Sequence, residues 1–367
     1  MENLVRSTGD FWSQQKVFLT GHTGFKGSWL ALWLQKLGAT VYGYSLPPEK
    51  DQSLFHLARV AEGMSSEFGD IRDSEKLRKS LNSSKANIVI HMAAQPIVRR
   101  SYVDPVETYS TNVMGLVNLF EAVRGSDAVK SVLNITSDKC YENKEQVWGY
   151  REKDPMGGHD PYSNSKACSE LITSAYKNSF FSENPSSGRK NAVIASCRSG
   201  NVVGGGDWSD DRLVPDLVKA FLRNEVAEIR NPNSVRPWQH VLEPLSGYMT
   251  LAERTLLYGE RYSGPWNFGP LTHMRYTVSE FAQKFTSSWS KNAKCKVKPD
   301  DGPHEAQLLS LDCAKANTEL DWLPKMDFRE TIQYTVDWYK AHQKGADMRL
   351  VCFDQIDTYM RKGVQYE

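Results

Sequence analysis

Short apolar runs alternate with longer segments of helical periodicity through the first 200 residues of this 367-residue chain. Runs of five or six residues rich in β-branched side chains predict buried strands. Strands that alternate with helices are typical of a parallel sheet covered by helices on both faces. The predicted fold class is therefore α/β, with a doubly wound parallel sheet. The predicted strands are residues 16–20, 40–44, 87–91, 132–137 and 192–197.

Two of the expected helices are clear from the spacing of their apolar residues. After Asp104 and Pro105, apolar side chains recur at positions 106, 109, 113, 116, 117 and 120, which places them along one stripe of a helix. A second helix is expected to begin near Tyr162 and to end at about Tyr176. Residues 182–191 are polar and rich in turn formers, so we expect a loop before the last strand.

Beyond Gly200 the pattern changes to short, irregular segments rich in glycine, proline and tryptophan. We interpret this half as a smaller C-terminal domain that binds the substrate and closes over the sheet. The expected division is residues 1–198 for the nucleotide-binding domain and residues 199–367 mainly for the substrate-binding domain. The boundary is soft, because a strand or helix of the second half can return to the sheet.

Composition narrows the class of protein. Apolar residues make up 40% of the chain and charged residues 24%, as in an ordinary globular protein. The net charge of +1 gives no electrostatic signature for binding nucleic acid or an anionic membrane. The six cysteines show neither CxxC spacing nor a cluster with histidine, so we expect reduced thiols, no bound metal and a cytoplasmic location. No apolar stretch approaches membrane-spanning length.

A glycine-rich loop follows the first predicted strand. Its glycines have the spacing GxxGxxG, and residues 28–37 behind it are expected to form a helix. In such a loop the first glycine permits a tight turn, the second lets backbone approach a pyrophosphate, and the third allows close packing of the helix. Between a strand and a helix, the loop predicts a dinucleotide site on a Rossmann-type sheet. The expected cofactor-binding residues here are Gly21, His22, Thr23, Gly24, Phe25, Lys26 and Gly27.

The end of the second strand bears on the choice between NAD and NADP. An acid at this position commonly binds the ribose hydroxyls of NAD, but this chain has Ser45, which offers a hydroxyl instead. No arginine stands beside Ser45 to receive a 2′-phosphate, so NAD is favoured as the cofactor. Asp70 and Ile71 lie where the third strand should end and are expected near the adenine. An ordinary turn aspartate is the alternative for Asp70.

A tyrosine and a lysine are separated by four positions at the start of the second expected helix. This spacing places Tyr162 and Lys166 on one face of the helix. A free tyrosine titrates near pH 10, and a nearby ammonium group is expected to lower its pKa by favouring the phenolate. About 25 residues upstream, a predicted strand ends in Ser137 and Asp138. Because ligands bind at the carboxyl ends of parallel strands, these four side chains are expected to meet in one site.

These features together resemble a known family. The glycine loop, the segment His-Met-Ala-Ala-Gln at 91–95, Ser137, Tyr162 and Lys166 resemble the extended short-chain dehydrogenases/reductases that act on nucleotide sugars. The resemblance covers nearly the whole chain. It implies that NAD takes a hydride from a sugar carbon while Tyr162 exchanges a proton with the hydroxyl there. It also implies that Lys166 holds the nicotinamide ribose and that Ser137 binds the reacting oxygen. Ala93, Ala94 and Gln95 are expected along the cofactor.

Two residues after Ser137 refine the expected reaction. In sugar 4-epimerases of this family the matching positions carry small uncharged residues, whereas hexose 4,6-dehydratases carry an acid and a base. This chain has Asp138 and Lys139. The resemblance therefore implies a 4,6-dehydratase, in which C4 is oxidised, water is lost across C5 and C6, and the hydride returns to C6. Asp138 would be the general acid, which requires a raised pKa.

Lys139 departs from the commonest dehydratase pattern, in which this position is a glutamate. With the segments TSDKCY, GHTGFKGSWL and GNVVGGGDW, it resembles the branch of these dehydratases that acts on CDP-glucose in deoxysugar biosynthesis, including that of O-antigen. As the base, Lys139 has to be neutral, which burial or a neighbouring cation would favour. The alternative is that Lys139 only pairs with Asp138. Nothing in the spacing or composition identifies cytosine.

The expected substrate side uses residues scattered over the chain. By resemblance, Asn201 contacts the substrate diphosphate, and Arg236 clamps it with a planar guanidinium that suits phosphate. A surface ion pair is the alternative for Arg236. Residues 211–215 are expected over the nucleotide. The expected substrate-binding residues are Gln95, Ser101, Tyr102, Asn201, Arg212, Arg236 and His304, of which Gln95, Ser101, Tyr102 and His304 could equally be structural.

Two other functions stay open for this sequence. One is an epimerase, or a dehydratase that acts on a sugar linked to a different nucleotide. The other is a non-catalytic NAD-sensing regulator, which would typically have lost Tyr162 or Lys166. In the family, the helices near residues 104 and 162 commonly pair with those of a second subunit. A homodimer is therefore expected, with a dimer of dimers left open.

Overall fold

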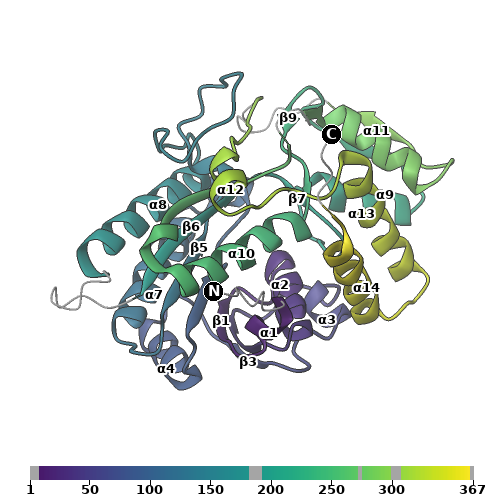
Figure 1. Ribbon diagram of the computed structural model, residues 1–367. Coiled ribbons are helices and arrows are strands. Elements are labelled where there is room, and N and C mark those ends of the chain that lie inside the picture. The colour runs from purple at the N-terminus through teal and green to yellow at the C-terminus, as the bar shows by residue number, and fades with distance from the viewer. Residues whose placement is uncertain (1–7, 182–191, 272–274, 299–306, 364–367) are drawn as a thin grey trace.

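The computed structural model describes residues 8–181, 192–271, 275–298 and 307–363. Seven parallel strands form one central sheet in the order β11-β6-β5-β4-β1-β2-β3, as Figure 1 shows. The direction of winding reverses between β1 and β4, which is the arrangement of a doubly wound Rossmann-type sheet. The predicted fold class is confirmed. The strands of this sheet are β1 Lys16–Thr20, β2 Thr40–Ser45, β3 Ser65–Phe68, β4 Ile88–His91, β5 Ser131–Ile135, β6 Val193–Ser199 and β11 Gly264–Phe268.

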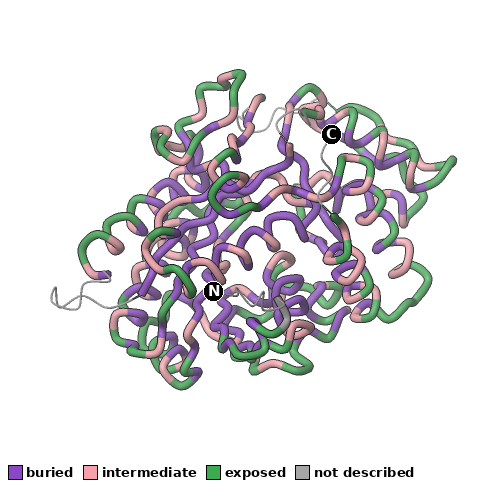
Figure 2. Tube along the Cα trace, viewed as in Figure 1, coloured by how far each residue is buried: buried purple, intermediate pink, exposed green. Residues whose placement is uncertain are grey.

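Helices cover both faces of the sheet (Figure 1). On one face lie α2 (Phe25–Lys36) and α10 (Leu242–Tyr258), and on the other lie α4 (Ser74–Ser84), α7 (Gly115–Arg124) and α8 (Pro161–Phe180). Strands β1, β4, β5 and β6 are almost entirely buried between these layers, as the purple core of Figure 2 shows. Burial on both faces explains why these strands are mainly apolar and do not alternate between apolar and polar residues.

Two expected helices differ from the sequence prediction in instructive ways. Helix α2 begins at Phe25, three residues earlier than expected, because Gly24 is extended (φ −76°, ψ 168°) and nothing after it breaks a helix. The helix expected after Asp104 and Pro105 is α6 (Pro105–Tyr109), the π-helical turn Ser110–Met114 and α7 in succession. Leu116 and Phe120 of its stripe are buried, whereas Val106 is 77% exposed. Helix α8 begins within one residue of the predicted start.

The second half of the chain does not form one separate unit. Helix α10 packs on β5 and β6, and β11 pairs with β6 to complete the sheet. Both elements come after residue 198 and yet belong to the layers of the central sheet. The expected division at residue 198 had left room for such a crossing. The loop expected at residues 182–191 lies outside the described residues.

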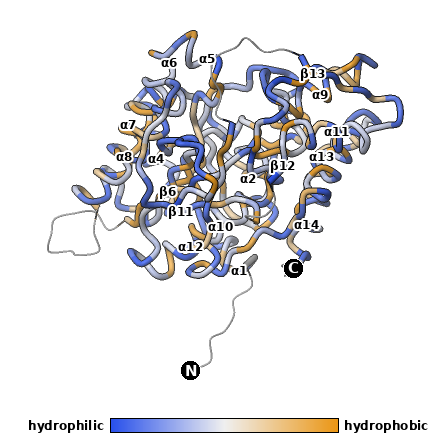
Figure 3. Tube along the Cα trace, turned by 90° about the horizontal axis from the view of Figure 1, so that it is seen from above, coloured by the Kyte–Doolittle hydropathy of each residue, from blue (hydrophilic) through white to orange (hydrophobic). Residues whose placement is uncertain are grey.

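The remaining elements lie around the sheet and its covering helices, and Figure 3 shows α9, α11 and α13 together. Three pairs of short strands link them: β7 with β10, β9 with β12, and β8 with β13. No helix of the described residues is both long enough and apolar enough to cross a membrane. These strands and helices are α1 Thr8–Trp12, α3 Leu54–Leu57, α5 Val98–Val103, β7 Val202–Val203, α9 Leu213–Leu222, β8 Ala227–Ile229, β9 Val235–Arg236, β10 Gln239–His240, β12 Tyr276–Thr277, α11 Val278–Trp289, β13 Cys295–Val297, α12 Ala314–Glu319, α13 Phe328–Gln343 and α14 Met348–Arg361.

Candidate active site

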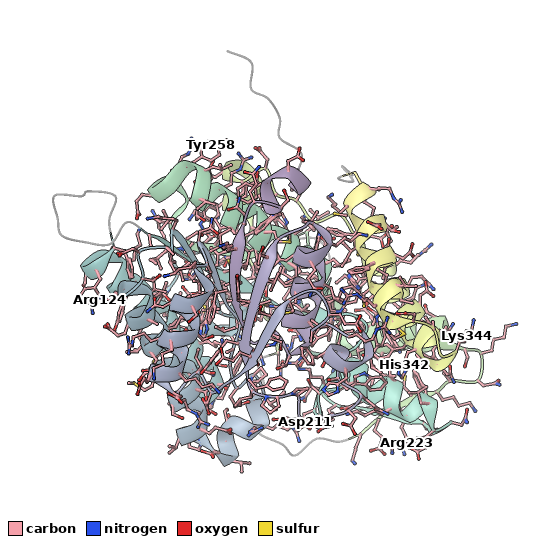
Figure 4. The ribbon with its side chains drawn as sticks, turned by 90° about the horizontal axis from the view of Figure 1, so that it is seen from below. Arg124, Asp211, Arg223, Tyr258, His342 and Lys344 are labelled. Carbon is pink, nitrogen blue, oxygen red and sulfur yellow. The ribbon has the colours of Figure 1, made fainter. Side chains whose placement is uncertain are left out.

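A cavity of about 1000 Å³ opens at the carboxyl edge of the sheet. Its wall is formed by the segments that follow strands β1 to β6 and by the segment that leads into α9. In Figure 4, Asp211 of that last segment lies between the sheet helices marked by Arg124 and the helices around Arg223. The predicted site residues that line the cavity are Gly21, Thr23, Gly24, Phe25, Lys26, Gly27, Ser45, Asp70, Ile71, Ala93, Ala94, Gln95, Ser137, Asp138, Lys139, Tyr162, Lys166, Asn201, Arg212 and Arg236.

The glycine loop brings backbone close to backbone. Gly21 has a φ of 77°, and a Cβ there would lie 2.7 Å from the amide nitrogen of Ala93. A Cβ on Gly27 would lie 2.1 Å from the carbonyl oxygen of Gly21. No side chain fits at either position without moving backbone. The first turn of α2 therefore sits against the loop, with its unpaired N–H groups at the cavity, which suits a pyrophosphate.

His22 is the one residue of the loop whose side chain does not reach the cavity. Its ring is buried, with Nε2 2.7 Å from the hydroxyl of Ser66 and an edge-on contact to Phe55. Burial lowers the pKa of His22 to about 4, so the ring is neutral near pH 7. The imidazole expected at the cofactor instead packs beneath the sheet edge, against Gly43.

The ends of β2 and β3 carry polar groups that suit an adenosine. Ser45 Oγ lies 2.8 Å from the hydroxyl of Thr23, and both side chains line the cavity. Asp70 accepts a hydrogen bond of 2.6 Å from Arg72, which holds the pKa of that carboxyl below its usual value. Arg72 also lines the cavity, yet its charge is balanced by Asp70.

Lys26 is a half-buried lysine in the first turn of α2. Its Nζ donates to Ser199 Oγ at 3.1 Å and to the hydroxyl of Tyr248 at 3.0 Å. Burial, followed by the charges of Lys166 and Arg212, lowers the pKa of Lys26 to about 7. The side chain predicted at the cofactor thus lies where α2, β6 and α10 converge.

Two of the residues expected near the hexose, Gln95 and Ser101, have structural contacts. The side-chain amide of Gln95 donates to Thr108 at 2.9 Å and accepts from the backbone N–H of Ile97 at 2.6 Å. These two hydrogen bonds stabilise the loop that follows β4. Ser101 is buried and accepts a hydrogen bond of 3.1 Å from the backbone N–H of Tyr162. Neither Ser101 nor Tyr102 lines the cavity, and His304 lies outside the described residues.

Ser137, Asp138 and Tyr162 meet at the floor of the cavity. Strand β5 ends at Ile135, so Ser137 caps the short 3₁₀ helix Asp138–Cys140 and donates to Asp138 Oδ1 at 3.0 Å. The other carboxylate oxygen, Oδ2, is buried and has no hydrogen-bond partner among the described residues. Burial raises the pKa of Asp138, against the charge of Lys139 and the hydrogen bond of Ser137. This is the environment of a carboxylic acid that gives up a proton.

The pKa of Tyr162 differs from the sequence expectation. Burial raises it to about 12, and the main groups that oppose this rise are Ser137 and Arg212. Lys166 Nζ donates instead to the carbonyl oxygen of Ile135 at 3.3 Å. Burial lowers the pKa of Lys166 to about 8. Both side chains line the cavity as the spacing predicts, but the cost of burying a phenolate exceeds the help from neighbouring cations.

Lys139 lies on the cavity wall directly after Asp138. Its backbone N–H donates to Ser137 Oγ at 3.2 Å, which fixes the start of the 3₁₀ turn. The described residues show no ion pair between Lys139 and Asp138, although the lysine charge lowers the pKa of the carboxyl through space. The two side chains are thus near neighbours without forming the simple pair considered as the alternative.

The opposite wall supplies two cations from distant segments. Arg212 precedes α9 and is held by the buried carboxylate of Asp207 at 2.9 Å. Arg236 of β9 is buried and donates through Nη1 to the carbonyl oxygen of Val235 at 3.1 Å. Asn201 lies just beyond β6 on the same wall. Two guanidinium groups and an amide in the lining of one cavity are groups that suit a diphosphate.

Sequence reasoning missed a buried network behind the cavity. Glu170 of α8 and Arg198 of β6 form an ion pair of 2.8 Å with both side chains almost fully buried. The four-residue step from Lys166 to Glu170 on one helix was a signal that could have found it. Among the described residues no group of three metal-ligating side chains occurs, and all six cysteines are free.

Known proteins are similar to this chain along nearly all of its length. The chain is 52% identical over 352 residues to the CDP-glucose 4,6-dehydratase of Salmonella typhimurium, covering 96% of this chain and 98% of that protein. A dTDP-glucose 4,6-dehydratase from Streptomyces venezuelae, solved with NAD, has a TM-score of 0.76 at 22% identity over 91% of this chain and 99% of its own. The family model for GDP-mannose 4,6 dehydratase matches residues 18–335. The chain therefore belongs to the GDP-mannose 4,6 dehydratase family.

Proposed function

We propose that this chain is an NAD-dependent CDP-glucose 4,6-dehydratase that forms CDP-4-keto-6-deoxyglucose and water. The observation that carries the reaction type is Asp138, a buried carboxyl with a raised pKa and an unpartnered oxygen beside Ser137 and Tyr162. An epimerase has no use for an acid at this place. The 52% identity to a CDP-glucose 4,6-dehydratase supports the nucleotide.

The residues of the cavity divide the work of the reaction. When bound, NAD would supply the hydride acceptor at C4 and the hydride donor at C6 of the sugar. The glycine loop, Ser45 and Asp70 would hold this cofactor, and Lys166 would hold its nicotinamide ribose. Tyr162 exchanges the proton of the C4 hydroxyl, while Ser137 donates a hydrogen bond to the same oxygen.

Loss of water requires an acid and a base after C4 has been oxidised. The C5 hydrogen is then acidic, and Lys139, which lines the cavity, would remove it. Asp138 protonates the C6 hydroxyl as it leaves, which its raised pKa favours. Arg212, Arg236 and Asn201 hold the diphosphate.

Assembly and location are further parts of this proposal. Several apolar side chains are exposed on adjacent helices: Val103 at 85%, Val106 at 77%, Met114 at 52% and Leu171 at 59%. Helices α6 and α8 pack side by side, so this surface suits pairing with a second copy in a homodimer, with a dimer of dimers as the larger form. Six free cysteines suit a cytoplasmic enzyme.

The nucleotide and the reaction are tested together by incubating the protein with CDP-, dTDP-, UDP- and GDP-hexoses. We expect a 4-keto-6-deoxy product with CDP-glucose, visible by its near-ultraviolet absorbance in alkali, and little with the other three. A 4-epimer as the product, or equal turnover of another nucleotide sugar, would refute the assignment. Turnover without added NAD would further establish that the cofactor is retained.

A further inference from the structure

Glu170 is a buried carboxylate one helical turn beyond Lys166, and it does not line the cavity. It accepts hydrogen bonds from Thr136 Oγ1 at 2.5 Å, Ser196 Oγ at 2.7 Å and Arg198 Nη2 at 2.8 Å. These donors are the residue that follows β5 and two residues of β6. One carboxylate thus ties α8 to the two strands beside it.

Arg198 extends the same network past the catalytic turn. Its Nη1 donates to the hydroxyl of Tyr141 at 2.7 Å and to the carbonyl oxygen of Glu152 at 3.0 Å. Tyr141 in turn donates to Asn267 of β11 at 2.7 Å. Thr136 directly precedes Ser137, and Tyr141 directly follows Cys140. The network therefore forms hydrogen bonds at both ends of the segment that carries Asp138 and Lys139.

The carboxylate also acts on the charge of Lys166. Burial is the largest influence on the pKa of Lys166 and lowers it, whereas Glu170 is the largest influence that raises it. Other titratable groups around Lys166 are the neutral phenol of Tyr162 one turn before it on α8, Cys140 on the 3₁₀ turn, His91 on β4 and Lys26 on α2. His91 is neutral, Cys140 is a thiol with a strongly raised pKa, and Lys26 repels. Glu170 is therefore the charged group that favours the ammonium form.

We infer that Glu170 and Arg198 are a positioning pair for the reaction, which keeps Lys166 charged and holds Asp138 and Lys139 in register with Tyr162. Stability alone does not call for such a pair, since apolar residues of similar volume often replace buried ion pairs without loss. This inference rests on the proposed function, because it uses the roles given there to Lys166 and Asp138. Glu170 and Arg198 act through these residues and do not touch the substrate.

The first test compares Glu170→Gln with Glu170→Asp in the full-length enzyme. Glutamine keeps the size but removes the charge, so Lys166 should lose its proton at lower pH, and the alkaline limb of kcat against pH should move down by about one unit or more. Aspartate keeps the charge and should leave the limb close to its wild-type position even where kcat falls. An unmoved limb in a folded Glu170→Gln enzyme would overturn the role given to Glu170.

A second measurement does not depend on turnover. The affinity for NAD is measured by calorimetry on protein stripped of cofactor, over a range of pH. As pH rises, the affinity should begin to fall at a lower pH in Glu170→Gln than in the wild type, since a neutral Lys166 holds the ribose less well. Glu243→Gln is the matched control, because Glu243 is equally buried but lies on α10 outside the cavity. Its two pH profiles should follow the wild type. If Glu170→Gln and Glu243→Gln give the same NAD profile, the inference fails.

Arg198→Lys tests the other half of the pair and guards against a Glu170 variant that does not fold. Lysine keeps the charge opposite Glu170 but cannot also reach Tyr141, so kcat should fall about tenfold or more with KM and the alkaline limb unchanged. An unchanged kcat would contradict the positioning of Asp138 and Lys139. Wild-type protein that is inactive with CDP-glucose would refute the proposed function instead, and the NAD profiles would still decide the role of Glu170.

Discussion

Asp138 at the cavity and Glu170 in the interior behind it are both almost completely buried. Their surroundings nevertheless shift the pKa values of the two carboxyls in opposite directions. Burial raises the pKa of Asp138, and one of its oxygens has no partner among the described residues. Hydrogen bonds and the charge of Arg198 overcome burial and lower the pKa of Glu170. A buried carboxyl without a full set of hydrogen bonds lowers stability, so its presence indicates a catalytic role. A buried carboxyl with all its hydrogen bonds made indicates a structural role.

The largest effect expected on the cavity side comes from Tyr162→Phe. Removal of the phenol hydroxyl takes away the proton exchange at C4, so kcat with CDP-glucose should fall by about 10³-fold or more. The backbone of residue 162 still contacts Ser101, and the melting temperature should change little. Product analysis and thermal melting check this together. Activity within tenfold of the wild type would show that Tyr162 is not the proton carrier.

Asp138→Asn should separate the two chemical steps. The amide cannot protonate the C6 hydroxyl, so formation of the 4-keto-6-deoxy sugar should fall by about 10²- to 10³-fold while C4 oxidation persists. In the wild type, the acid form of Asp138 is lost as pH rises through its raised pKa, so the dehydration rate should decline on that side. Rapid-quench analysis of single turnovers measures both steps. Normal dehydration by the variant would make Asp138 structural.

Lys139→Ala removes the proposed base while the backbone hydrogen bond to Ser137 stays. We expect C4 oxidation to remain and loss of water to fall by about 10²-fold, since C5 keeps its hydrogen. Exchange of the C5 hydrogen with deuterated solvent should stop in the same variant. Full formation of the 4-keto-6-deoxy product would sink the assignment of Lys139.

Glu243 extends the comparison to a third buried carboxyl, held by two backbone amides and Tyr359. Burial raises its pKa to about 7 from an ordinary value of 4.5. Its contribution to stability is therefore full below about pH 4.5 and is lost as pH rises through 7, the reverse of Glu170. As pH rises from 5 to 8, the wild type should lose about 3 kcal/mol of unfolding free energy relative to Glu243→Gln, which has no carboxyl to titrate. Equal pH dependence of the two melting temperatures would contradict this.

Ser196→Ala should have the smallest effect, on the interior side. It removes one of the three donors to Glu170, and a hydrogen bond to a charged group contributes about 1.5–3 kcal/mol. Ser287→Ala, on the exposed face of α11, is the matched control and should change stability by less than about 0.5 kcal/mol. Urea unfolding of both variants measures the difference. If the two changes are equal, the carboxylate of Glu170 does not depend on its serine donor.

The cavity side was largely predictable from the sequence, because local backbone patterns position its residues. The glycine loop places Gly21 and Gly27 through the turn and the helix that follow β1, and four-residue spacing brings Tyr162 and Lys166 to one face. Long-range packing decided the features that local patterns did not indicate. His22 turned away because Ser66 and Phe55 offer it a buried site, and Tyr162 has a raised pKa because burial outweighs cations.

The interior side could not be predicted because its residues meet only in the folded chain. Arg198 is 28 positions from Glu170 and 57 from Tyr141, and no local pattern relates them. The return of α10 and β11 to the sheet is likewise a matter of tertiary pairing. Resemblance to a family suggested the reaction, but it did not indicate which buried groups hold the acid and the base in place.

The central claim is that the wild-type enzyme removes hydrogen from C4 of CDP-glucose and delivers it to C6 of the product. Incubation with CDP-glucose that carries deuterium at C4 tests this directly by mass spectrometry and nuclear magnetic resonance. We predict a 4-keto-6-deoxy product with the deuterium on C6. Deuterium that remains on C4, or a product that keeps its C6 hydroxyl, would contradict the dehydratase account.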